Sequence, residues 1–240
     1  MKTIPLKYIR EDSAVGNADS SEDARESTGL LERLVAGVRR QLAGLSPAAE
    51  PLRRADLLLQ LGRALVRLER QAEAWAAARE AFGLYLADQA WEGAAQACDI
   101  LFLSEQPLSL AALGQGIWLA VTYPVDPELS AALLQHVVDE TPPEADGAAV
   151  AAITAHYLAD LRAREPQREH LLIFTNQLLA TVARRHSGVE NQRDFGKWIE
   201  DMELNDPALF LPRLRNVVDV LVQDDWWFDR DALQAALPAH

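Results

Sequence analysis

Residues 55–88 read ADLLLQLGRALVRLERQAEAWAAAREAFGLYLAD. The leucines of the first half recur every three or four positions, at Leu58, Leu61, Leu65 and Leu68. The second half repeats this spacing with small and aromatic residues, at Ala74, Ala78, Ala81 and Tyr85. Such spacing places the apolar side chains on one face of a helix. The stretch therefore predicts two amphipathic helices joined by a short turn.

The same helical spacing extends outward from this stretch. Apolar stripes recur over residues 91–102 and 110–121, and strand-like alternation is absent from the body of the chain. Prolines interrupt the pattern at intervals, at Pro47, Pro107, Pro127, Pro142, Pro143 and Pro207. Asp126-Pro127 and Asp206-Pro207 each put a capping acid before a proline at the first helical position. Pro212 is expected to kink the last long helix or to reset its start.

About ten helices joined by short turns follow from this pattern. Short connections make sequence neighbours antiparallel. We therefore predict an all-α fold, an irregular stack of antiparallel helix hairpins.

Residues 55–88 resemble one tetratricopeptide repeat, a helix–turn–helix unit of 34 residues. The first helix matches at Leu58, Leu61, Gly62 and Leu65, and the second at Ala74 and Ala81. Ala78 stands where a bulky aromatic residue is usual, and Leu86 stands where a closing proline is usual. The spacing after residue 88 breaks the period. The resemblance implies an irregular α-solenoid or helical bundle with a groove that binds a peptide or a protein.

Composition divides the chain into three parts. Residues 1–29 are predicted as a disordered tail, because residues 11–28 are polar and acidic. Thr3–Ile9 is an apolar segment within that tail. It either docks on a partner, for example by adding a strand to a sheet edge, or folds back on its own core. Residues 30–189 are the predicted helical-hairpin domain, and residues 190–240 a small acidic helical subdomain.

The net charge of −13 argues against a nucleic acid as the main ligand, because binding phosphates requires a basic surface. No apolar run approaches the roughly 20 residues that span a bilayer, so no membrane segment is expected. Residues 1–10 lack the apolar block of a secretory signal, and the single Cys98 excludes an intramolecular disulfide. These features together favour the cytoplasm.

The charges are unevenly distributed. Residues 33–79 hold nine Arg against four acids, whereas residues 80–161 hold twelve acids and no Lys or Arg. Three interpretations remain open. The segregation is compositional drift, or the middle helices present acids to a basic partner, or the acids pair internally with basic helices.

Few residues suggest chemistry. His136 with Glu140, and His156 with Asp160, are spaced to share a metal on one helix face, but no Glu-x-x-His completes a di-iron pattern. Cys98 lies in an apolar stripe with no basic residue nearby, which favours a buried structural role. Gly114-Gln115-Gly116 lies inside an apolar helix, where its glycines allow close packing. We expect no catalytic residue, no metal site and no cofactor.

The strongest candidate for recognition is the sequence DDWWFDRD at residues 224–231. Trp226, Trp227 and Phe228 stand among acids that include Asp224 and Asp225. Exposed Trp and Phe are typical interface anchors, and flanking acids select a basic partner. In the other interpretation, a Trp plugs the end of the bundle and Asp229 caps a last helix.

The leading expectation for function is non-catalytic. The chain is expected to be an adaptor, scaffold or assembly factor that binds another protein within a larger complex. The alternative is a helical enzyme or small-ligand sensor with a pocket between hairpins. A self-assembling structural subunit is a third possibility, and the sequence does not indicate an oligomeric state.

Overall fold

The computed structural model describes residues 7–9, 21–46 and 50–237. Within these residues the chain forms eleven α-helices and no strand, so the predicted all-α class is confirmed. The helices are α1 (Ser21–Gly44), α2 (Pro51–Arg67), α3 (Gln71–Ala87), α4 (Trp91–Leu103), α5 (Ser109–Thr122), α6 (Pro127–Glu140), α7 (Gly147–Arg162), α8 (Gln167–Ser187), α9 (Gln192–Asp201), α10 (Pro207–Val222) and α11 (Arg230–Ala235).

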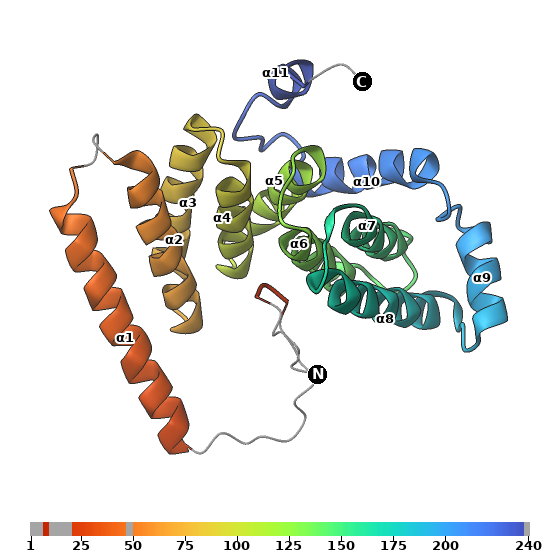
Figure 1. The fold of residues 1–240 in the computed structure, drawn as a ribbon, viewed down its shortest axis with the longest axis horizontal. Helices are drawn as coiled ribbons and strands as arrows, with labels where there is room; N and C mark the ends of the chain where they lie inside the picture. Colours follow the sequence, from red (N-terminus) through yellow and green to blue (C-terminus); the bar gives the residue numbers. More distant parts are fainter. Residues whose placement is uncertain (1–6, 10–20, 47–49, 238–240) are drawn as a thin grey trace.

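Successive helices pack side by side as antiparallel pairs in two layers (Figure 1). Helices α2, α4, α6 and α8 contact one another in order and form what we call the A layer. Helices α3, α5 and α7 alternate with them along the chain, and each packs on the two A-layer helices next to it in sequence; we call them the B layer. Helix α10 returns to pack against α5 and α7, so the predicted C-terminal subdomain shares its core with the hairpins.

Three successive hairpin turns each place a left-handed residue just after the end of a helix. Glu69, Gln89 and Glu105 follow the ends of α2, α3 and α4, and each adopts a left-handed backbone, with φ of 57°, 57° and 51°. In the first two turns the next amide closes a hydrogen bond to a carbonyl of the last helical turn. This geometry satisfies carbonyls that would otherwise lack a partner and reverses the chain within three residues. The next helix therefore starts antiparallel to the last.

The predicted hairpin over residues 55–88 is confirmed as α2 and α3. Ala74 and Ala81 are fully buried, which lets α3 approach its neighbours closely. Gly62 has the same role on α2, because a Cβ at this position would lie 3.0 Å from Ile100 on α4. Small residues thus set the spacing of the first three helices of the stack.

The predicted helix starts agree with the structure except at α1. Asp126, Asp206 and Asp229 each cap a helix by accepting a backbone N–H. Helix α1 begins at Ser21, whereas the prediction started it at residue 30 and placed residues 21–28 in a disordered linker. Glu, Ala and Arg are good helix formers, so a helix nucleated later in α1 extends backward through them. Helix α10 continues through Pro212.

Arginines of α7 and α8 cap the C-terminal ends of α5 and α6, which lie in the stretch without Lys or Arg (residues 80–161). Neither α5 nor α6 has a basic residue in its last turn. Arg162 of α7 donates to the carbonyls of Ala120 and Val121 at the end of α5, at 2.6 and 2.8 Å. Arg185 of α8 donates to the carbonyl of Val138 at the end of α6, at 2.5 Å. A cation at a helix C-terminus also complements the helix dipole.

Arg162→Ala should lower the free energy of unfolding by about 2 kcal/mol, because two charge-assisted hydrogen bonds are lost and the α5 carbonyls lose their donor. The melting temperature should fall by about 4–8 °C. Arg164→Ala is the matched control, since Arg164 is exposed two residues away and carries the same charge. Equal melting of the two variants, measured by circular dichroism, would contradict the capping role.

Candidate functional site

The predicted recognition residues lie in the link between α10 and α11, residues 223–229, which we call the aromatic turn. Asp224 and Asp225 are exposed, whereas Trp226, Trp227 and Phe228 are each partly buried. The three rings pack against side chains of α3 and α5. The turn therefore places its aromatic residues against the stack and its two carboxylates in solvent.

Trp227 packs edge-to-face on two rings of α3. Its ring centroid lies 6.0 Å from that of Trp75 and 5.4 Å from that of Phe82. The Arg79 guanidinium lies 4.2 Å from the Trp227 centroid. Burial lowers the pKa of Arg79 below its usual value. The negative face of the Trp227 ring offsets part of this cost by attracting the cation.

The rings of Trp226 and Phe228 both pack on the ring of Trp118 of α5. The Trp118 centroid lies 6.2 Å from that of Trp226 and 5.3 Å from that of Phe228. The Arg230 guanidinium lies 4.8 Å from the Trp226 ring centroid. The aromatic turn is thus held by rings from two helices and flanked by two guanidinium groups.

Gln115 fixes the backbone of the aromatic turn. This fully buried residue of α5 accepts a hydrogen bond from the Trp227 N–H at 2.8 Å. Its amide nitrogen donates to the Asp225 carbonyl at 3.4 Å and to the Ala111 carbonyl at 3.2 Å. A buried amide with several partners specifies one position for the turn.

Gly114 and Gly116, on either side of Gln115, allow close helix packing, as the sequence predicts. A Cβ at Gly114 would lie 2.5 Å from Val222 of α10, and one at Gly116 would lie 2.7 Å from the Cβ of Cys98. The sequence prediction missed Gln115 itself. A lone polar side chain within the apolar residues 110–121 was the available signal.

The start of the described chain packs on the A layer. The Tyr8 N–H donates to the Glu128 carboxylate of α6, and the Arg63 guanidinium of α2 lies 5.7 Å from the Tyr8 ring centroid. Ile9 is buried. Lys7–Ile9 therefore folds back on its own core, as one of the two interpretations predicted, while Thr3–Leu6 lies outside the described residues.

The residues considered for chemistry have structural partners. The His136 Nε2 lies 3.0 Å from the Asp99 carboxylate, and the His156 Nδ1 lies 3.0 Å from the Thr175 hydroxyl. Burial raises the pKa of the Cys98 thiol and lowers that of His156. Among the described residues, no group of three or more His, Cys, Asp or Glu side chains could hold a metal ion.

The acidic stretch at residues 80–161 is partly neutralised from outside. Three of its acids pair with arginines of other segments: Glu80 with Arg54, Asp146 with Arg213, and Asp160 with Arg168. These pairs fit the interpretation of internal pairing for part of the stretch. They are exposed enough that each contributes little stability.

Comparisons of the chain with protein-family models, curated proteins and solved structures gave no match. In the part of the chain that the structure describes, no helix combines the length and apolar character needed to span a bilayer.

Proposed function

We propose that the chain is a non-catalytic protein-interaction module, an adaptor, scaffold or assembly factor of a larger complex. The aromatic turn is the proposed contact, with Asp224 and Asp225 meeting a basic surface and the exposed parts of Trp226, Trp227 and Phe228 packing beneath it. The stack of hairpins is then the rigid support, and we regard it as a degenerate relative of tetratricopeptide repeats.

One observation carries this proposal: the two exposed carboxylates of Asp224 and Asp225 belong to a turn whose backbone and rings are held by α3 and α5. Gln115 holds the backbone on both sides of Trp226, and α3 and α5 hold the rings. A preorganised turn has little conformational entropy left to lose on binding. Tryptophan is among the residues enriched at interface hot spots.

The test removes the two charges and leaves the shape unchanged. Asp224→Asn with Asp225→Asn should slow association with a basic partner about three- to tenfold at low salt, because the charges steer encounter. Partners are captured from native lysate on the immobilised full chain and identified. Their association rates are then measured by surface plasmon resonance at several salt concentrations. The melting temperature should stay within about 2 °C of the wild type.

Glu190→Gln with Glu200→Gln is the matched control, since both residues are exposed, lie near α9 and carry the same charge. This control should bind like the wild type. A partner that binds the wild type and both double variants with one rate and one salt dependence would refute the aromatic turn as its contact.

A further inference from the structure

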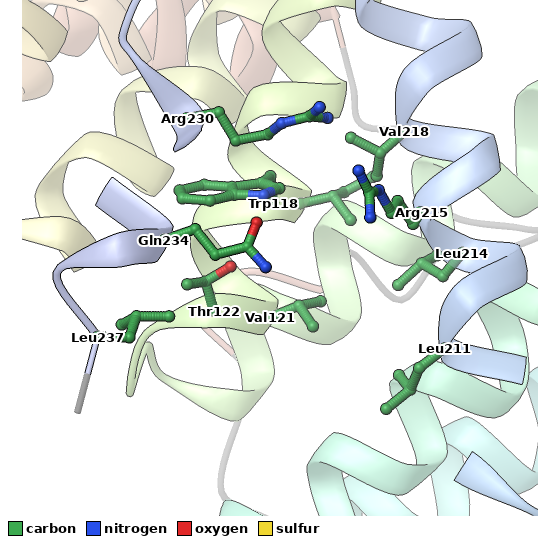
Figure 2. A pocket seen from close by; sticks show the side chains of 11 residues that line it. Trp118, Val121, Thr122, Leu211, Leu214, Arg215, Val218, Arg230, Gln234 and Leu237 are labelled. Carbon is green, nitrogen blue, oxygen red and sulfur yellow. The ribbon is translucent and has the colours of Figure 1, made fainter. Parts of the chain in front are cut away.

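A pocket of about 270 Å³ lies between α5, α10 and α11 (Figure 2). Ile117, Leu214 and Val218 form its buried floor. Trp118, Val121 and Leu211 add apolar walls. Ligand pockets typically measure about 300–1,000 Å³ and combine apolar walls with a few polar groups. This pocket therefore has room for a small ligand, on the order of nine times the volume of a water molecule.

The polar groups of the pocket belong to Thr122, Arg215, Arg230 and Gln234. Figure 2 shows the side chain of Arg230 extending past Trp118 toward Val218, where the guanidinium of Arg215 also lies. Asp219 joins the two arginines, because its carboxylate lies 2.6 Å from Arg230 Nη1 and 3.9 Å from Arg215 Nε. Two cations thus meet at one side of an apolar cavity.

The existing ion pairs leave this side of the pocket able to accept another anion. Of the two arginines, only Arg230 is within hydrogen-bond distance of Asp219, because Arg215 Nε lies 3.9 Å from the Asp219 carboxylate. Asp231 lies 3.8 Å from Arg230, but its side chain is 88% exposed and is screened by water. A guanidinium has five N–H donors, so both arginines retain donors for a ligand.

We propose that this pocket binds a small apolar monocarboxylate. Arg215 and Arg230 hold the carboxylate, because a guanidinium matches the geometry of two carboxylate oxygens. The hydrocarbon part covers Ile117, Leu214 and Val218. The volume fits an acid of roughly ten non-hydrogen atoms. This site is separate from the proposed protein contact, and it is the observation that favours a small-ligand sensor as a further role.

Two residues that line the pocket also contact the aromatic turn. Trp118 lines the pocket and packs on Phe228, and Arg230 lines it and lies over Trp226. An occupied pocket therefore changes the surroundings of Trp118 and Trp226. Tryptophan fluorescence should report binding with the same midpoint as calorimetry.

Octanoate is the probe, titrated into the full chain by isothermal titration calorimetry. We expect one equivalent to bind with a dissociation constant of about 0.1–1 mM, which is typical of an apolar ligand of this size. Octan-1-ol, which has the same chain without the charge, should bind about tenfold more weakly. Octylamine, which carries the opposite charge, should not bind. The absence of saturable octanoate binding, or equal affinities for octanoate and octan-1-ol, would overturn the proposal.

Variants locate the site. Arg215→Gln should weaken octanoate binding about tenfold, through loss of a charge-assisted contact. Val121→Phe should abolish binding by filling the cavity. Arg193→Gln, an exposed arginine on α9, is the matched control and should bind like the wild type. If Val121→Phe does not fold, Arg215→Gln decides alone, since its side chain is 64% exposed. Unchanged affinity in Arg215→Gln, or equal losses in Arg215→Gln and Arg193→Gln, would refute the site.

Discussion

Trp227→Ala should melt about 6–12 °C below the wild type, a loss of about 3 kcal/mol. Each edge-to-face aromatic pair contributes about 0.5–1.5 kcal/mol beyond its buried area, and Trp227 makes such pairs with Trp75 and Phe82. The cation of Arg79 over its face adds about 0.5–2 kcal/mol. Differential scanning calorimetry of both proteins measures the effect.

Trp227→Phe is the control, because it keeps a ring against Phe82 and should recover most of the lost stability. The same variants also test the proposed function. If Trp227 contacts the partner, the alanine variant should release a captured partner about thirtyfold faster, as expected for an interface anchor. A variant that melts early and still releases its partner at the wild-type rate would assign Trp227 to the core alone.

Gly116→Ala and Gly83→Ala should differ in stability by about 3 kcal/mol, although each adds one methyl group to a helix. A Cβ at Gly116 would lie 2.7 Å from the Cβ of Cys98, an atom next to the backbone of α4. The helices α4 and α5 must therefore move apart, at a net cost of about 2 kcal/mol. Gly83 has nothing within 4 Å of its position, so alanine there should stabilise α3 by about 0.5–1 kcal/mol.

The pair is its own control, because intrinsic helix propensity changes equally at both positions. Urea unfolding, followed by circular dichroism, gives both free energies on one scale. If both variants gain stability, the close approach of α4 and α5 at Gly116 is contradicted. If both variants lose the same amount of stability, the contact with Cys98 is not the cause of the loss at Gly116.

The helices could be predicted from the sequence because their signals are local. Apolar spacing over residues 55–88 and the capping acids Asp126 and Asp206 each act within a few residues. One feature of the helices themselves was not predicted in this way. The start of α1 depends on helix propagation into a polar segment.

The turns and the candidate site depend on interactions that local patterns do not contain. A left-handed residue after a helix is usually glycine, yet Glu69, Gln89 and Glu105 take this conformation here. The aromatic sequence at residues 226–228 was visible, but its packing on α3 and α5 could not be predicted, because those helices lie far away in the sequence. Arg215 and Arg230 approach the same pocket only once α10 has returned to the stack.

The hydrogen bonds of Gln115 have a consequence for how the protein is made. Its partners Asp225 and Trp227 follow it by 110 and 112 residues. A ribosome adds about 5–20 residues per second, so α5 is complete roughly 5–20 seconds before the aromatic turn is synthesised. During that interval the amide of Gln115 and the rings of Phe82 and Trp118 face water or other molecules in the nascent chain's surroundings. Chaperone binding to the newly made chain should therefore persist through the synthesis of α5 to α10 and fall once Phe228 is free to pack on Phe82 and Trp118.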